Sequence, residues 1–355
     1  MFQSDLKSKI LREDFSVIVD SASSDLDQIV NSEVMITGAS GFVGSWLVGS
    51  WLWARESLKG TGRLLLVCRN TEGLAKKYAS SISAGHLILQ AADVRSLQLP
   101  PSFRPQLVVN AATPARESLN VKQPLEMLNI IIDGQKRLLE ISQEAGVERF
   151  LFLSSGAVYG SIPLSLKQVP EDYMGAPHIR DPAMAYHEGK RVAELMGNIC
   201  SQNSSMGFVS ARLFAFLAPF LPIDEHFAAG NFIGNAIRNE DIIIKSGGGS
   251  IRSYQYGTDL VTWLWALLVR GKSGDAYNVG SDESLSIKEL AKKVAEISAS
   301  GISVKIMGKD EVTNISQYVP SVKKMSQEFR LGNQIRLQQS IIRSISRLKE
   351  GDNDK

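Results

Sequence analysis

The chain has 355 residues, enough for one large or two ordinary domains with a full core. Its 39 Lys and Arg residues nearly balance 37 Asp and Glu residues, and the net charge of +2 argues against nucleic acid as a partner. Two cysteines, Cys68 and Cys200, are too few for a disulfide framework or a metal cluster and favour a reducing, cytoplasmic setting. No signal-peptide pattern opens the chain, and its apolar stretches are too short to span a membrane. We expect a globular intracellular protein with no metal.

Residues 1–30 are mixed and polar. Their apolar residues show weak helical spacing, at Leu6, Ile10, Ile18, Leu26 and Ile29. We interpret this segment as an N-terminal extension that packs on the edge of the first strand, and we assign no chemistry to it.

A glycine-rich turn follows Val34–Ile36, a short apolar run that indicates a buried strand. After the turn, residues 45–55 continue as a largely apolar helix. Of the three glycines, the first allows a tight turn, the second allows close approach to a pyrophosphate, and the third lets the helix pack on the sheet. Glycines also cluster in ordinary turns, but this order of strand, turn and helix favours a dinucleotide site. Its predicted contacts are Gly38, Ser40, Gly41, Phe42, Val43 and Gly44.

Further apolar runs predict four more strands, at 64–67, 86–89, 107–109 and 150–153, and a long helix at 125–145. Strands and helices that alternate in this way are typical of parallel β-α-β units. We therefore predict an α/β fold with a doubly wound parallel sheet of the Rossmann type. The predicted dinucleotide-binding domain spans 31–212, with 254–282 returning to it, and a smaller C-terminal substrate-binding lobe spans 213–355.

The end of the second strand distinguishes the two nicotinamide dinucleotides. A carboxylate there would bind the ribose hydroxyls and select NAD, but this chain has Cys68 and then Arg69. An arginine can pair with a 2′-phosphate, so NADP(H) is favoured; NAD(H) and a plain surface arginine remain the alternatives. After the third strand, Asp93 could accept from the adenine amino group, with Val94 on the ring, or Asp93 could simply cap a loop. The other predicted cofactor contacts are Ala111, Ala112, Tyr186, Lys190 and Leu213.

Two segments carry the candidate catalytic residues. Ser155 lies just beyond the fifth strand, and open α/β sheets bind ligands outside the carboxyl ends of their strands. Tyr186 and Lys190 are four residues apart on a predicted helix, so they share one face. A lysine ammonium beside the phenol would lower the pKa of Tyr186 from about 10 and make it an acid–base near neutrality. We predict Ser155, Tyr186 and Lys190 as the catalytic set.

These motifs resemble the extended short-chain dehydrogenase/reductases of the nucleotide-sugar-modifying branch, over residues 33–345. The resemblance implies that Ser155 polarises the sugar oxygen and that Tyr186 passes the proton. It also implies that Lys190 holds the nicotinamide ribose and tunes the tyrosine.

The resemblance extends to the second half of the chain. Arg212–Phe214 is similar to the family's Arg-(Ile/Tyr)-Phe-Asn stretch, but Ala215 stands where Asn is usual, which removes one expected substrate contact. Asn231, Phe232 and Arg252 match the family's nucleotide-diphosphate cradle, in which Asn231 and Arg252 would bind the pyrophosphate. The implied partners are a nucleoside-diphosphate sugar and a second copy of the chain, joined through the helices at 125–145 and 186–200.

Within this branch the chain looks most like UDP-glucuronate decarboxylases, with one decisive departure. Decarboxylases place Glu where this chain has Ala157, and sugar 4,6-dehydratases place Asp-Glu at Gly156–Ala157. Alanine and glycine move no proton, so both lyase reactions lack an acid or base. Reduction of a keto-sugar and 4-epimerisation through a transient ketone remain. A reductase consumes fresh cofactor, commonly NADPH, so Arg69 favours an NADP(H)-dependent reductase of a 4-keto-6-deoxy nucleotide sugar.

Three alternatives stay open at this point. One is an NAD-dependent nucleotide-sugar 4-epimerase, another is a reductase of hydrophobic ketones, and the third is a catalytically silent Rossmann protein that senses dinucleotide. Asn231 and Arg252 favour a diphosphate substrate over a hydrophobic ketone. Retention of all three catalytic residues favours an enzyme over a silent sensor.

Overall fold

The computed structural model describes residues 7–113, 117–225, 227–299, 301–309 and 315–352. Its chain divides into two compact units, which are described separately. The first comprises Met1–Gly160, Ala176–Arg212 and Val261–Tyr277, and the second comprises Ser161–Gly175, Leu213–Leu260 and Asn278–Lys355. No helix among the described residues is long and apolar enough to cross a membrane.

A seven-stranded sheet organises the first unit, in the order β3-β2-β1-β4-β5-β6-β9. Its strands are β1 (Val34–Thr37), β2 (Leu64–Cys68), β3 (Leu87–Ala91), β4 (Leu107–Asn110), β5 (Arg149–Ser155), β6 (Gly207–Leu213) and β9 (Ala276–Val279). The pairs around β1 and β4 are parallel and in matched register, so that Thr37 lies opposite both Val67 and Asn110. The carboxyl ends of these strands therefore meet along one edge, as a doubly wound sheet requires. The predicted α/β Rossmann fold is confirmed.

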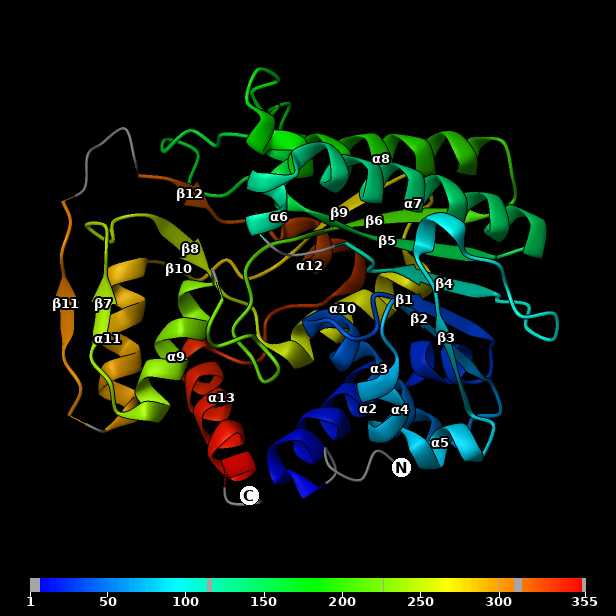
Figure 1. Cartoon of the computed structure of the whole chain (residues 1–355), viewed down its shortest axis with the longest axis horizontal. Coiled ribbons are helices and arrows are strands. Elements are labelled where there is room, and N and C mark those ends of the chain that lie inside the picture. Colours follow the sequence, from blue (N-terminus) through cyan, green and yellow to red (C-terminus); the bar gives the residue numbers. More distant parts are fainter. Residues whose placement is uncertain (1–6, 114–116, 226, 300, 310–314, 353–355) are drawn as a thin grey trace. The chain divides into compact units, whose positions relative to one another are not determined.

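Helices cover both faces of this sheet (Figure 1). The helices and short turns of the first unit are α2 (Lys9–Val30), α3 (Phe42–Ser57), α4 (Glu72–Lys77), α5 (Ala79–Ser83), η1 (Val94–Ser96), α6 (Glu117–Lys122), α7 (Pro124–Ala145), η2 (Gly156–Tyr159), η3 (Pro182–Met184) and α8 (Ala185–Gln202). α10 (Gly257–Arg270) begins in the second unit and ends in the first. Apolar residues of α7 and α8 pack with Met35, Val108 and Phe150 of the sheet into one buried core.

The N-terminal segment forms an amphipathic helix, α2, which is kinked at Ala22 and packs on α3. The Phe15 ring contacts Trp46 edge-on at 5.8 Å between centroids. A Cβ at Gly49 would meet that ring at 2.5 Å, so the glycine allows the two helices to approach closely. The expectation that this segment lies on the edge of the first strand is wrong, because β1 lies between β2 and β4 and has no free edge.

The second unit holds two small sheets and four helices. Its elements are α9 (Ala228–Arg238), β7 (Ile242–Ile244), β8 (Ile251–Ser253), β10 (Ser284–Ser286), α11 (Ile287–Ser298), β11 (Val304–Ile306), β12 (Gln317–Tyr318), α12 (Lys323–Phe329) and α13 (Leu337–Asp352). The strands pair as β10-β8-β12 and β11-β7. Apolar residues of α9, α11 and α13, including Ile233, Leu290 and Ile341, form the core of this unit.

Candidate active site

The three glycines of the β1–α3 turn are present for different structural reasons. Gly38 has φ +69°, and a Cβ there would meet the Ala111 carbonyl oxygen at 2.3 Å. A Cβ at Gly44 would lie 2.5 Å from the Gly38 oxygen. Gly41 has an ordinary φ of −80°, and its Cβ would find a protein atom no nearer than 3.4 Å. Packing alone therefore requires glycine at the first and third positions, whereas a ligand explains glycine at the second.

A cavity of about 280 Å³ opens beside this turn. Its lining residues are Gly38, Ser40, Gly41, Val67, Cys68, Arg69, Ala92, Asp93, Val94, Ala111, Ala112, Thr113 and Ile130. Eight predicted cofactor contacts are thus brought together, from the carboxyl ends of β1, β2, β3 and β4. Phe42, Val43 and Gly44 lie behind it in the first turn of α3, and Leu213 ends β6. The long, mixed polar and apolar hollow at a helix N-terminus fits a dinucleotide.

Charged side chains gather at the β2 and β3 ends of this cavity. Arg69 is exposed and forms no hydrogen bond or ion pair with another described residue. Asp93 is occupied: its Oδ1 accepts from the Arg95 backbone N–H and Nε, and its Oδ2 accepts from an Arg95 terminal nitrogen at 2.8 Å. Arg95 also pairs with Glu126 at 3.0 Å. Hydrogen bonds from Arg95 lower the pKa of Asp93, so this carboxylate is ionised and neutralised by its own neighbour.

The predicted catalytic side chains converge at the end of β5. The side chains of Ser155 and Tyr186 are hydrogen-bonded to each other, and Ser155 Oγ also accepts from the Ala157 N–H. Lys190 Nζ donates to the Leu153 carbonyl at 2.6 Å and to Thr113 Oγ1 at 2.9 Å. Its ammonium lies 5.8 Å from the centre of the Tyr186 ring. Helical spacing and the strand end together bring the three groups into one cluster.

Burial governs the acid–base properties of this cluster. It raises the pKa of Tyr186 above its usual value, and the hydrogen bond with Ser155 acts weakly against it. Burial also lowers the pKa of Lys190 to about 7, while the charge of Glu194 opposes this shift. The expected lowering of the Tyr186 pKa is wrong, because burial disfavours the charged phenolate and raises the pKa instead.

A buried network that the sequence analysis did not assign lies behind these residues. Glu194 accepts two hydrogen bonds from Arg212 Nε and one from its terminal nitrogen at 2.8 Å. Ser154 Oγ donates to the same carboxylate at 2.5 Å, and Arg212 donates to Tyr159 Oη at 3.0 Å. Glu194 could have been found from the sequence by its position, because it lies four residues after Lys190 and therefore on the same face of the helix.

The predicted diphosphate contacts lie in the second unit and differ in their availability. Asn231, on the first turn of α9, has a buried Oδ1 with no hydrogen-bond partner among the described residues. Arg252 is engaged: it donates to the carbonyls of Ile251 and Ser316 at 2.8 and 3.0 Å, and to Ser316 Oγ at 2.8 Å. Phe232 is buried in the core of this unit.

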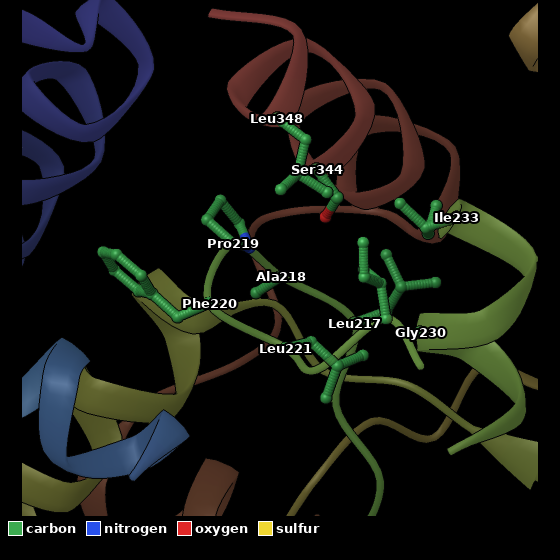
Figure 2. Close-up of a pocket in the computed structure, with 10 residues that line it drawn as sticks. Leu217, Ala218, Pro219, Phe220, Leu221, Gly230, Ile233, Ser344 and Leu348 are labelled. Atoms are coloured by element: carbon green, nitrogen blue, oxygen red, sulfur yellow. The ribbon is translucent and has the colours of Figure 1, made fainter. Parts of the chain in front are cut away.

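A second, smaller cavity in the same unit is apolar and holds about 10 Å³. Figure 2 shows Leu217 and Leu221 on one side of it and Ser344 of α13 on the other. The Ser344 hydroxyl is buried without a partner in the described part of the chain. This volume is about that of one water molecule, so the hollow is too small for a sugar.

Comparison with known proteins places this geometry in a family. A model of the NAD dependent epimerase/dehydratase family matches residues 34–280. The chain belongs to this family. The expected membership among the extended short-chain dehydrogenase/reductase enzymes is thereby confirmed. The matched segment begins at β1 and ends just after β9, so it includes the glycine turn, Ser155 and Tyr186.

Curated relatives of this family member are decarboxylases. UDP-glucuronic acid decarboxylase 2 from Arabidopsis thaliana is 29% identical over 264 residues, which cover 74% of this chain and 56% of that protein. UDP-glucuronic acid decarboxylase 1 from Xenopus tropicalis is 27% identical over 269 residues, which cover 76% of this chain and 61% of that protein. The chain thus spans less than two thirds of the length of either relative.

Solved structures share the fold over most of the chain. A UDP-glucose 4-epimerase from Thermotoga maritima, solved with UDP-glucose, superposes with a TM-score of 0.77 at 18% identity, covering 90% of this chain and 99% of that one. A dTDP-glucose 4,6-dehydratase from Bacillus anthracis, solved with NAD, gives 0.75 at 17% identity, covering 91% and 98%. Because these identities are 18% and 17%, the two comparisons show only that the fold is shared.

Proposed function

We propose that this family member is an NADP(H)-dependent reductase of a keto nucleotide sugar, of the 4-keto-6-deoxy type. The observation that carries the proposal is a complete Ser155, Tyr186 and Lys190 set that lacks a further acid or base at Ala157. A reductase needs one hydride and one proton, whereas the lyase reactions need a second proton-transfer group.

The residues of the cluster divide the reaction between them. A reduced nicotinamide dinucleotide, which the residues lining the cavity beside the glycine turn would hold, would supply the hydride for the carbonyl carbon of the sugar. Ser155 donates a hydrogen bond to the carbonyl oxygen and Tyr186 delivers a proton to it, so that the ketone becomes an alcohol. The Lys190 ammonium stabilises the phenolate that remains until a solvent proton replaces the one lost.

Position 157 argues against carrying the relatives' activity over to this chain. The reported relatives are UDP-glucuronic acid decarboxylases, and the family pattern that the chain resembles implies a Glu in such enzymes where this chain has Ala157. Ala157 has no ionisable group, and its backbone N–H is bound to Ser155 Oγ at 3.1 Å. The neighbouring Gly156 supplies no acid or base either. These two residues support the reductase over either lyase.

Charge at the end of β2 supports NADP(H) as the cofactor. Arg69 lines the cavity close to Asp93 but forms no hydrogen bond or ion pair with another described residue, so its guanidinium is available to a 2′-phosphate. The nearby carboxylate of Asp93 is neutralised by Arg95 and repels a phosphate less than a bare carboxylate would. The dehydratase from Bacillus anthracis, which shares the fold, was solved with NAD. The proposal is therefore tested by comparing the binding of NADPH and NADH to this protein directly.

We also propose a nucleoside-diphosphate substrate and a homodimer. The Asn231 amide and the positive charge of Arg252 support the diphosphate, because the Asn231 Nδ2 can donate to a phosphate oxygen and Arg252 can do so once it exchanges its bonds to Ser316 for the ligand. Leu195 and Ile199 support the dimer: they are 58% and 52% exposed and lie one turn apart on α8.

Three measurements on the purified protein test the proposal. We expect mass spectrometry to find no bound NAD, fluorescence titration to give tighter binding of NADPH than NADH, and NADPH to be oxidised with a 4-keto-6-deoxy nucleotide sugar. Stoichiometric bound NAD with interconversion of two sugar epimers would instead identify an epimerase. Binding of dinucleotide without turnover of any keto-sugar would favour the sensor.

A further inference from the structure

Lys190 is held by neutral groups. Its ammonium donates to Thr113 Oγ1 at 2.9 Å and to the Leu153 carbonyl at 2.6 Å, and it lies 4.6 Å from the centre of the Phe152 ring. Its side chain forms no ion pair with a described residue and is 2% exposed. Thr113 is therefore the one side chain of the described chain that binds this ammonium by a hydrogen bond.

The carboxylate of Glu194, on the same helix as Lys190, is already hydrogen-bonded to other side chains. Glu194 lies one turn further along α8, but Arg212 and Ser154 occupy its oxygens. Another ionisable neighbour among the described residues is Tyr186 on the same helix, while Tyr159 is bound by Arg212. From α7, the neutral Gln135 reaches α8. The Glu194 charge still favours the Lys190 ammonium from a distance, but the groups that bind this ammonium directly are Thr113 and the Leu153 carbonyl.

The turn that carries Thr113 is itself anchored. The Thr113 N–H donates to the Ala111 carbonyl at 3.0 Å, and the Ala112 N–H donates to Asn110 Oδ1 at 3.1 Å. Asn110 is buried, and it donates to Gln135 Oε1 at 2.7 Å while accepting from Thr37 Oγ1 at 2.8 Å. A buried amide pair therefore fixes the turn between β1, β4 and α7.

The same amide pair leads back to the helix of Lys190. Gln135 Nε2 donates to the Ala193 carbonyl of α8 at 3.5 Å. A chain of hydrogen bonds thus runs from α8 through Gln135, Asn110 and the turn to Thr113, and closes on Lys190. Such a closed circuit fixes the threonine hydroxyl relative to the helix that bears the lysine.

We propose that Thr113 is a positioning residue for catalysis, whose hydroxyl holds the Lys190 ammonium at the carboxyl end of β4, on the wall of the dinucleotide cavity. Its oxygen accepts from the ammonium, and Thr113 itself lines the cavity beside the glycine turn. The kinetic part of the proposal rests on the proposed function, whereas the position and charge of Lys190 do not.

The first test uses the dinucleotide-free protein and needs no substrate. The titration of Lys190 is followed by NMR with lysine labelled at Cε, and its signal is identified by its absence in Lys190→Arg. Thr113→Val keeps the shape and removes the hydroxyl, so the charged form loses an acceptor, and we expect the midpoint to fall by about one pH unit. Thr113→Ser keeps the hydroxyl and should titrate as the wild type does. An unchanged titration midpoint of Lys190 in Thr113→Val overturns the proposal. If Thr113→Val does not fold, the same measurement is made on Thr113→Ala.

The second test measures turnover of the keto-sugar with NADPH. In Thr113→Val we expect kcat to fall about 10- to 100-fold, KM for the sugar to change less than about threefold, and the alkaline limb of the pH profile to move down by about one unit. Thr113→Ser should recover kcat to within about threefold. Equal loss in both variants, with unmoved pH limbs, would indicate a merely structural threonine. If the wild type turns over no keto-sugar, the proposed function fails while the NMR result still decides the role of Thr113.

Discussion

Ser154 donates a 2.5 Å hydrogen bond to Glu194, and this contact joins the end of β5 to the middle of α8. Ser155, the proposed catalytic serine, follows Ser154 directly in the chain, and Lys190 precedes Glu194 by one helical turn. Arg212, from β6, completes the pair with a 2.8 Å contact. The strand that carries Ser155 is therefore joined to the helix that carries Lys190 by a hydrogen bond to a carboxylate that also forms a buried ion pair with β6.

Removing the charge of Glu194 should destabilise the fold. The Glu194 and Arg212 side chains are 10% and 16% exposed, so Glu194→Gln leaves a buried guanidinium without its counter-charge. We expect the free energy of unfolding to fall by about 3–5 kcal/mol. Urea denaturation followed by circular dichroism measures it. The matched control is Glu72→Gln, which breaks an exposed pair with Lys76 and should cost about 0–1 kcal/mol. Equal losses in the two variants would contradict a special role for the buried pair.

Replacing the phenol should abolish chemistry and spare binding. Tyr186→Phe removes the proton donor but keeps the ring that packs near Lys190. We expect kcat to fall by about 10²–10⁴-fold, the range for loss of a general acid. The dissociation constant of NADPH, measured by fluorescence, should change less than about threefold. Turnover at the wild-type rate would remove Tyr186 from the mechanism.

Cofactor preference should depend on Arg69. Arg69→Ala removes the guanidinium available to a 2′-phosphate, and loss of a charge-assisted hydrogen bond costs about 1.5–3 kcal/mol. We expect NADPH to bind about 10- to 100-fold more weakly while NADH binding stays within about twofold. The exposed Arg104, which does not line the cavity, gives the control variant Arg104→Ala. A parallel loss for both dinucleotides would show that Arg69 does not read the 2′ position.

The depressed pKa of Lys190 should appear in the stability of the protein. The folded protein holds this proton with a pKa of about 7, against 10.5 for an ordinary lysine. The unfolded chain therefore binds more protons between pH 7 and 10.5, and this group makes stability rise with pH across that window.

Lys190→Met removes this penalty. At pH 6 we expect the variant to be more stable than the wild type by about 1–2 kcal/mol, after the loss of two hydrogen bonds is deducted. The gain should shrink as the pH approaches 10.5. Urea denaturation between pH 6 and pH 10 measures it, with the exposed Lys76→Met as control. A difference that stays constant with pH would show that Lys190 titrates alike in both states.

A charge on the outer face of α8 should separate the proposed dimer. Leu195 and Ile199 are exposed and adjacent on that helix. Leu195→Glu combined with Ile199→Glu should convert a dimer into a monomer in sedimentation velocity, because the charges would be desolvated at the interface. Met174→Glu, at an exposed residue of the second unit, is the control. A wild-type monomer, or a dimer that persists in the double variant, would rule out this surface.

Much of the first unit could be predicted because its signals are local. The apolar run of β1, the spacing of Gly38, Gly41 and Gly44, and the four-residue interval between Tyr186 and Lys190 each reflect backbone geometry that neighbouring residues specify. The predicted helix at 45–55 starts earlier, at Phe42, because Gly41 itself takes the N-cap position. The placement of residues 1–30 was wrong, since no local pattern tells which surface an amphipathic helix will cover.

The residue types and intervals of the sequence determined the parallel sheet, the glycine turn and the cluster of Ser155, Tyr186 and Lys190 proposed as catalytic, since each arises from patterns along a few residues. Tertiary structure alone decided what surrounds those groups. Thr113 accepts a hydrogen bond from Lys190, which lies 77 positions away in the chain, and Arg212 of strand β6 forms an ion pair with Glu194 of helix α8. Burial by such distant segments also reversed the expected pKa shift of Tyr186, because desolvation depends on everything packed around a group and not on its neighbours in sequence.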